Sequence, residues 1–208
     1  ELAVPLIAAS GRLEGVLNLE SPLVGGFSEA DSLLLQALAT QAVIAIQEVR
    51  LLDAMQEVAE WLLTQSPVDV LGRLAELACH LLDVYASAIW TVEGGGLRLE
   101  AACGSYFVES DRTGLRGELV GQAALERHPV RATTEDAPSG ATWVLVVPLE
   151  GQGGAALGAF GVAGTATQSR GSEWDEKVLT CLAHYAALAV ENASRQETLR
   201  LMRERHAY

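Results

Sequence analysis

The sequence predicts an α+β fold: an antiparallel sheet of about six strands flanked by helices, preceded by a strand hairpin and a long connecting helix. Three observations support this prediction. Apolar runs of strand length occur in pairs around polar or Gly-rich turns, the stretches between the pairs have helical periodicity, and one segment of the chain occurs twice. Runs of strands alternating with helices in this order are typical of an antiparallel sheet with helices packed on it.

The segment that occurs twice is a strand hairpin followed by an Ala-rich helix. The interval from Pro5 to Gly15 equals that from Pro148 to Gly158, and an apolar strand follows each Gly. A long period seen once indicates a tandem of whole domains, because the units of a solenoid repeat every ~20–50 residues. We therefore expect the C-terminal part of a first domain over residues 1–52. The helices that follow the two hairpins match at Leu38, Ala39, Ala42 and Ala45 in the first copy and at Leu182, Ala183, Ala186 and Ala189 in the second.

A single long helix is predicted over residues 28–65, because no Pro or Gly occurs between Ser28 and Thr64. Ser28 is a favourable N-cap, and Asp31 can complete a capping box. The helix would be about 50 Å long, which is more than one small domain needs, so we interpret it as a connector shared by two domains or two chains. One side of it carries an apolar seam with 4-3 spacing, which we interpret as a dimer contact. The seam residues are Leu38, Ala42, Ala45, Val49, Leu52, Ala59 and Leu63, with Gln56 as the polar member.

A complete domain is expected over residues 58–194, and residues 195–208 are expected to continue its last helix as a signalling helix. Ser66 and Pro67 end the long helix and start a second one. The remaining elements are expected as strands at 86–92 and 97–103, an irregular stretch at 104–118, a short helix at 119–127, strands at 143–149 and 157–163, and a helix from residue 172 onward.

Composition excludes several classes of function. The net charge of −13 disfavours nucleic acid and anionic membranes as partners, since phosphate binding requires clustered Lys and Arg. Gln, Glu, Arg and Asp interrupt the Ala-rich helices, so we expect no run of ~20 apolar residues able to span a bilayer and no membrane contact. Cys79, Cys103 and Cys181 lie far apart in sequence and form no metal-ligand cluster. Such sparse thiols are typical of a reducing compartment, and we expect a cytoplasmic protein.

Several motifs in the expected order make the chain resemble the GAF domain family. The resemblance covers residues 58–194, and residues 1–52 resemble the last third of a second copy. The residues that carry it are Ala88, Ile89 and Trp90 in a strand, 117–123 as a turn into a short helix, His128, Pro129 and Val130 followed by Glu135 and Asp136, 147–149 with Leu157 and Gly158, and, in the first copy, 15–21 and 27–31.

The resemblance implies a sensory or regulatory module and not an enzyme. Members of the family typically lie upstream of histidine kinases, cyclases or transcriptional regulators, and often form homodimers through helices. It implies a pocket for an unidentified small molecule between the sheet and residues 104–136. By family analogy the lining would be Trp90, Cys103, Phe107, Leu119, Ala123, Trp143 and Leu145.

The resemblance alone does not specify a ligand. We find no bilin motif, because Cys79 and His80 are adjacent only on the first helix of the complete domain, and no cyclic-nucleotide motif. His128 is the one candidate for a haem ligand near the pocket loops, and a His before Pro in a loop is more often simply exposed.

Two other functions stay open at this point. One is a GAF domain that binds nothing and only dimerises. The other is an enzyme resembling the free methionine sulfoxide reductases, which use clustered cysteines. A reductase would need a second thiol within disulfide reach of Cys103, the cysteine expected near the pocket mouth.

The first hairpin, strands 1–8 and 15–20, should be marginal by itself, because isolated two-stranded hairpins are barely stable in water. We expect another chain to cover its apolar face. Docking within the same chain is not expected, since a straight helix would hold the hairpin roughly 50 Å from the complete domain.

Overall fold

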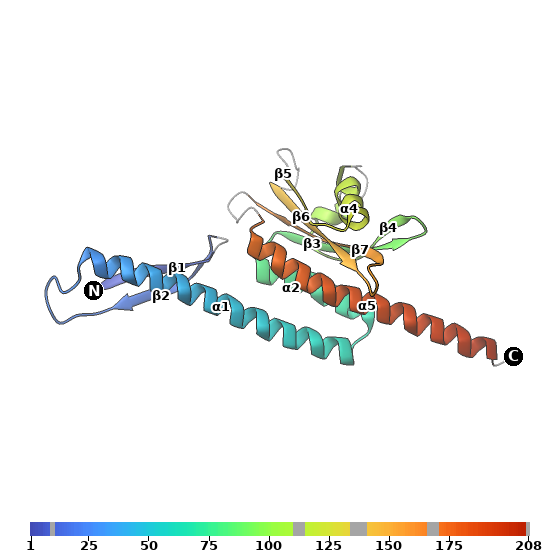
Figure 1. Ribbon diagram of the computed structural model, residues 1–208, viewed down its shortest axis with the longest axis horizontal. Coiled ribbons are helices and arrows are strands. Elements are labelled where there is room, and N and C mark those ends of the chain that lie inside the picture. Colours follow the sequence, from blue (N-terminus) through green and yellow to red (C-terminus); the bar gives the residue numbers. More distant parts are fainter. Residues whose placement is uncertain (9–10, 110–114, 134–140, 166–170, 207–208) are drawn as a thin grey trace.

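The computed structural model describes residues 1–8, 11–109, 115–133, 141–165 and 171–206, and confirms the α+β class (Figure 1). A two-stranded sheet comes first and is followed by a long helix and then by a five-stranded sheet with its own helices. In chain order the elements are β1 (Leu2–Ile7), β2 (Leu13–Leu19), α1 (Glu29–Thr64), α2 (Pro67–Leu82), β3 (Ala86–Glu93), β4 (Gly96–Cys103), α3 (Tyr106–Glu109), α4 (Leu115–Glu126), β5 (Val130–Thr133), β6 (Trp143–Glu150), β7 (Ala156–Gly164) and α5 (Glu173–His206).

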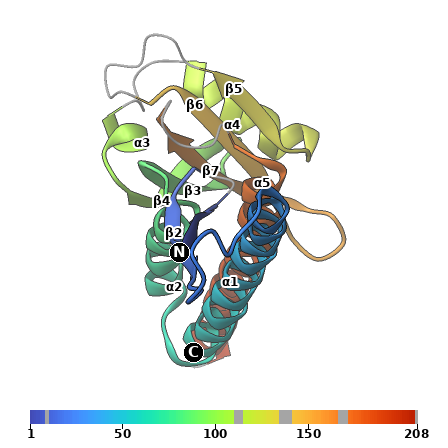
Figure 2. The same cartoon turned by 90° about the vertical axis from the view of Figure 1, so that its left-hand side faces the viewer.

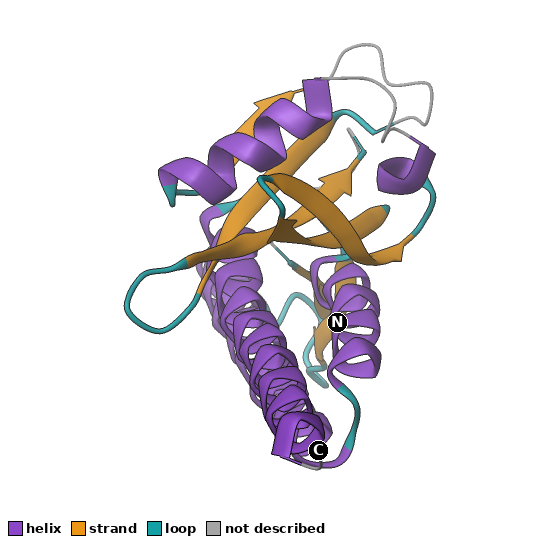
Figure 3. Cartoon of the chain, turned by 90° about the vertical axis from the view of Figure 1, so that its right-hand side faces the viewer, coloured by secondary structure: helices purple, strands orange, loops and turns teal. Residues whose placement is uncertain are grey.

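The larger sheet is antiparallel, with the strand order β4-β3-β7-β6-β5. The long helices α2 and α5 cover one face, and α3 and α4 lie on the other (Figures 1 and 3). The sheet therefore separates two apolar cores. We call them the α2/α5 core and the α3/α4 core.

Strand β6, which lies between β7 and β5, contributes to both cores, because successive side chains of a strand point to opposite faces. Val144 and Val146 lie in the α3/α4 core. The intervening residues Trp143, Leu145, Val147 and Leu149 lie in the α2/α5 core. A strand buried on both faces reads as a continuous apolar run, as this one does.

Helix α1 begins as the sequence predicts. Ser28 and Asp31 form a capping box, with the Ser28 backbone N–H donating to Asp31 Oδ2 at 2.7 Å and the Asp31 N–H donating to Ser28 Oγ at 3.3 Å. The helix has 36 residues, a length of about 54 Å. It ends before Pro67, where Ser66 caps α2.

Two separate structures pack on the buried side of α1. Near its start, Leu35 and Ala39 contact Val4 of the hairpin. Further along, Val58 and Trp61 belong to the α2/α5 core of the complete domain. The guanidinium carbon of Arg73 on α2 lies 5.1 Å from the centre of the Trp61 ring. Seen along its length, α1 lies with α2 and α5 on one side of the sheet (Figure 2).

The apolar face of the hairpin is covered by the same chain, so the expectation that another chain covers it is wrong. Strands β1 and β2 pair from Leu2↔Leu19 to Leu6↔Gly15, and the face containing Val4 rests on α1 of the same chain. The hairpin runs back along α1 toward the complete domain instead of projecting away from it (Figure 1). Helix length alone does not measure the separation, because the chain reverses direction between β2 and α1. The opposite face still exposes Ile7, Leu13 and Val16.

An 18-residue window of α1 meets the length and composition criteria for a membrane-spanning helix, and 17% of it is buried. This corrects the expectation that polar interruptions exclude such a window. Its polar residues include Gln36, Thr40 and Gln41, and the apolar residues around them outweigh these interruptions. Length and composition alone are weak evidence for a span, because the core helices of water-exposed domains share both.

Candidate functional site

The seven predicted pocket residues do not come together. Trp90, Phe107 and Ala123 meet in the α3/α4 core, where the family resemblance places the pocket. The rings of Trp90 and Phe107 pack edge to face with centroids 5.1 Å apart, and Tyr106 packs against Phe107 in the same way at 4.9 Å. Leu119 is half-buried on α4. We call Trp90, Tyr106 and Phe107 the aromatic cluster.

Cys103, Trp143 and Leu145 lie in the α2/α5 core, on the opposite face of the sheet. Their assignment to the pocket is therefore wrong. For the two β6 residues the physical reason is strand parity: a shift of one residue moves a side chain to the other face, and β6 is apolar at both sets of positions.

Small residues form the floor beneath the aromatic cluster. Ala88 and Ala159 are fully buried there, and a Cβ atom on Gly161 would come within 3.0 Å of the Trp90 ring. Because the side chains at this point are small or, at Gly161, missing, Trp90 can lie against the sheet. Residues 110–114 and 134–140, including the motif residues Glu135 and Asp136, lie outside the described residues.

A cavity of about 350 Å³ opens at the junction between the hairpin and the complete domain. Four elements meet there: the start of β2, the middle of α1, the end of α2 and the start of α5. We call it the junction cavity. Its lining residues are Arg12, Glu14, Gln47, Arg50, Leu51, His80, Leu81, Trp174 and Val178.

Glu14 fastens the hairpin to α1 at this cavity. Its side chain is 3% exposed, and its two oxygens pair with Arg12 and Arg50, each at 2.5 Å. Burial opposes ionisation of Glu14, but the hydrogen bonds and charges of the two guanidinium groups outweigh it and hold the pKa of Glu14 below its usual value. No local motif indicates this cluster, because Arg50 lies 36 residues from Glu14 and the two residues meet only when α1 packs on the hairpin.

Acid should loosen this junction. A carboxylate whose pKa is lowered by folding stabilises the protein above its unfolded-state pKa, and this contribution disappears as the pH falls through the lowered folded-state pKa. Between pH 7 and pH 3 we expect the hydrogen-exchange protection of β1 and β2, relative to the intrinsic exchange rate at each pH, to fall more in the wild type than in Glu14→Gln, whose side chain does not titrate. An equal loss of protection in the two proteins would exclude Glu14 as the origin.

The predicted seam of α1 faces away from everything that α1 packs on within the chain. Leu38, Val49, Leu52 and Leu63 are 52%, 56%, 60% and 87% exposed. Ala45, Gln56 and Ala59 are exposed, and Ala42 is half-buried. The seam is thus an uncovered apolar face about 180° from Val43 and Val58.

The upper part of the seam, by which we mean its N-terminal residues Leu38 and Ala42, resembles the core of a domain. Leu182 and Ala186 of α5, the counterparts of Leu38 and Ala42, are fully buried beside α2 and the sheet. A helix packed on α1 as α2 packs on α5 would therefore bury Leu38. Because Val49, Leu52, Ala59 and Leu63 lie further along α1, that helix would leave the lower part of the seam for another contact.

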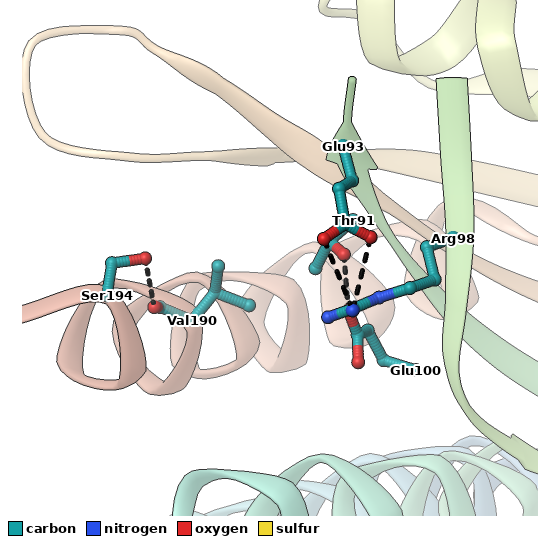
Figure 4. Close-up of polar contacts among 6 residues, drawn as sticks. All are labelled: Thr91, Glu93, Arg98, Glu100, Val190 and Ser194. Atoms are coloured by element: carbon teal, nitrogen blue, oxygen red, sulfur yellow. Dashed lines mark hydrogen bonds and ion pairs between the residues drawn. The ribbon is translucent and has the colours of Figure 1, made fainter. Parts of the chain in front are cut away.

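A charged cluster lies at the tip of the β3–β4 hairpin (Figure 4). Arg98 pairs with Glu100 at 2.7 Å and with Glu93 at 3.1 Å, and the Thr91 hydroxyl donates to Glu100 at 2.5 Å. Figure 4 also shows a separate contact on α5, where Ser194 donates to the Val190 carbonyl at 3.2 Å. Both carboxylates are occupied by Arg98, so the cluster offers no free acid–base pair. Across the described part of the chain, no three His, Cys, Asp or Glu side chains are grouped as metal ligands.

The sequence model of the GAF domain matches residues 1–46 and 66–190. Among solved structures, the GAF domain of a proposed sensor histidine kinase from Pseudomonas syringae pv. tomato is 20% identical with a TM-score of 0.62, over 80% of this chain and 99% of that one. The GAF domain of an Acinetobacter phosphoenolpyruvate-protein phosphotransferase is 16% identical with a TM-score of 0.56, over 72% of this chain and 98% of that one.

A type II free methionine-R-sulfoxide reductase from Thermoplasma acidophilum shares the fold as well. It is 20% identical with a TM-score of 0.51, over 61% of this chain and 93% of that one. No curated protein matches the chain. The sequence match and the fold agree, and the chain belongs to the GAF domain family, with the matched sequence in two segments.

Proposed function

We propose that this sensory or regulatory GAF module binds a small molecule in its complete domain and relays the change through α1 and α5, as a homodimer in a cytoplasmic signalling protein such as a histidine kinase or cyclase. One observation carries the proposal: α1 packs on both GAF segments with the same side. Leu35 and Ala39 contact the hairpin, and Val58 and Trp61 enter the core of the complete domain.

A relay of this kind follows from packing. Close-packed side chains transmit small shifts, because interiors have few voids in which a displacement could be absorbed. A movement of α2 or α5 against the sheet therefore changes the packing around Val58 and Trp61, and α1 transmits that change toward the hairpin. The ligand must favour one of two packings for the change to have a direction.

The aromatic cluster is the favoured place for the ligand. Trp90, Phe107 and Ala123 give an apolar floor with aromatic walls, the lining usual in small-molecule sites. Native mass spectrometry of protein purified without added ligand is the test. We expect part of the protein to carry a bound molecule, and expect Ala123→Leu, which adds bulk beside the aromatic cluster, to lose it. Ala193→Leu on the exposed side of α5 is the matched control.

A wild-type protein that shows only the mass of the bare polypeptide would favour the alternative, a GAF domain that dimerises without a ligand. The reductase alternative is less favoured. Cys79 and Cys103 lie together in the α2/α5 core, away from the aromatic cluster. Burial is the main cause that raises the pKa of Cys79 to about 12, so its thiolate is scarce at neutral pH.

The lower part of the seam is the proposed dimer contact. Val49→Glu combined with Leu52→Lys should convert the dimer to a monomer without unfolding it, because both side chains are exposed within one chain. In a dimer both charges would leave water, and their attraction for each other does not fully offset a desolvation penalty of several kcal/mol per ion. Light scattering coupled to size exclusion measures the result, and Glu57→Lys, on an exposed flank of α1, is the control. A wild-type monomer at high concentration would contradict the proposed dimer.

A further inference from the structure

Two cysteines that are far apart in sequence flank one buried serine. Cys103 ends β4 and lies directly opposite Ser87 on β3, which places their Cβ atoms about 4.5–5.5 Å apart. The Ser87 hydroxyl donates to the carbonyl of Ala75 on α2 at 2.6 Å. Cys79 follows Ala75 by one helical turn, so both residues lie on the same face of α2.

Cys79 and Cys103 are neighbours across this helix–strand boundary, because Cys103 lies opposite Ser87 and the Ser87 hydroxyl is bonded to α2 one turn before Cys79. Both cysteines are reduced, half-buried and packed at the edge of the α2/α5 core. Neighbours on the two sides of one serine can approach to the Cβ separation of about 3.5–4.5 Å that a disulfide spans.

We propose that Cys79 and Cys103 form a reversible dithiol–disulfide pair, a redox-modification site that couples the end of α2 to the edge strand β4. The co-substrate is a small peroxide in the oxidising direction and a dithiol in the reducing direction. This input is separate from the aromatic cluster, since the pair lies on the other face of the sheet.

The chemistry balances with one peroxide. The Cys103 thiolate attacks one oxygen of hydrogen peroxide, the O–O bond breaks, and Cys103 sulfenic acid and water form. The Cys79 sulfur then attacks the sulfenic sulfur, an S–S bond forms, and the hydroxyl group leaves as water with the Cys79 proton. Two thiols lose two electrons and two protons, and one peroxide is reduced to two waters.

Cys79 is suited to the second step. Burial is the main cause that raises its pKa, and the thiolate of Cys103 adds to the rise. Once Cys103 is oxidised to the neutral sulfenic acid, that added contribution disappears and Cys79 ionises more readily. The remaining effect of burial keeps the reaction slow at neutral pH and makes it faster as the pH rises.

A disulfide at this point constrains packing. It ties α2, which lies between α1 and the sheet, to a strand that has a neighbour on one side only. The oxidised protein should therefore show a higher melting temperature and slower hydrogen exchange at the end of α2 and in β4 than the reduced protein.

The test uses the whole protein, fully reduced and then treated with a few equivalents of hydrogen peroxide. We expect the intact mass to fall by two hydrogens. Digestion without reductant should give a linked pair of peptides containing Cys79 and Cys103, and a dithiol should reverse the link. Cys181→Ser should behave as the wild type, because Cys181 lies on α5 outside the pair, whereas Cys103→Ser should give no link.

Two results would overturn the proposal. One is oxidation of Cys103 to the sulfinic acid with no linked peptide. The other is a linked peptide that contains Cys181. Circular dichroism of Cys103→Ser, whose side chain keeps a similar size, checks that loss of the link does not reflect loss of the fold.

Discussion

Replacing Val58 with Asp should unfold the complete domain or lower its melting temperature by on the order of 10 °C or more. Val58 is 0% exposed and lies on α1 inside the α2/α5 core. A carboxylate buried there without a partner costs several kcal/mol, a large share of the ~5–15 kcal/mol that stabilises a typical domain. Thermal unfolding followed by circular dichroism measures the effect.

The matched control is Val49→Asp, the same substitution on the opposite side of the same helix. Val49 is 56% exposed, so its charge stays in water within one chain. We expect the Val49 variant to keep a monomer stability close to that of the wild type and to weaken dimerisation. Equal destabilisation by the two substitutions would mean that Val58 of α1 is not buried in the α2/α5 core.

The second large effect is expected from Leu182→Ala compared with Leu38→Ala. The two leucines occupy equivalent positions in the repeated segment, but Leu182 is fully buried and Leu38 is 52% exposed. Deleting a buried leucine leaves a cavity and costs about 2–5 kcal/mol, whereas an exposed one costs much less. Urea denaturation of both variants gives the difference.

The comparison also reports on what covers α1. If a second chain packs on the upper part of the seam in solution, Leu38→Ala should lower the free energy of unfolding about as much as Leu182→Ala does, and the loss should depend on protein concentration. If another segment of the same chain packs there, the loss should be as large. A small, concentration-independent cost would show that the upper seam faces water.

Local chemistry made most of the fold predictable from sequence. Ser28 with Asp31, and Ser66 with Pro67, fix two helix starts within one residue, because capping depends on neighbouring side chains. The turn at residues 93–96 fixes the first hairpin of the complete domain. The one-turn helix α3 was missed, since four residues carry too little periodicity to indicate a helix.

The site was less predictable because it depends on parity and on distant contacts. Trp90 and Phe107 lie on the face of the sheet where the pocket is expected, whereas Trp143 and Leu145 lie on the opposite face. Polarity alternation shows which way a strand faces only when one of its faces is polar, and β6 is apolar on both. The residues around Glu14 do not indicate its ion pair with Arg50 either, because that contact forms only when α1 packs on the hairpin.

We infer that α1 makes the hairpin and the complete domain one cooperative unit. Hydrogen exchange of the β1 and β2 amides in Val58→Ala and Val49→Ala is the test, since both residues lie outside the cluster that packs the hairpin on α1. We expect faster exchange in the hairpin strands of the Val58 variant and wild-type exchange in the Val49 variant. Hairpin exchange that is the same in both variants and the wild type would contradict it, because the two GAF segments would then open independently.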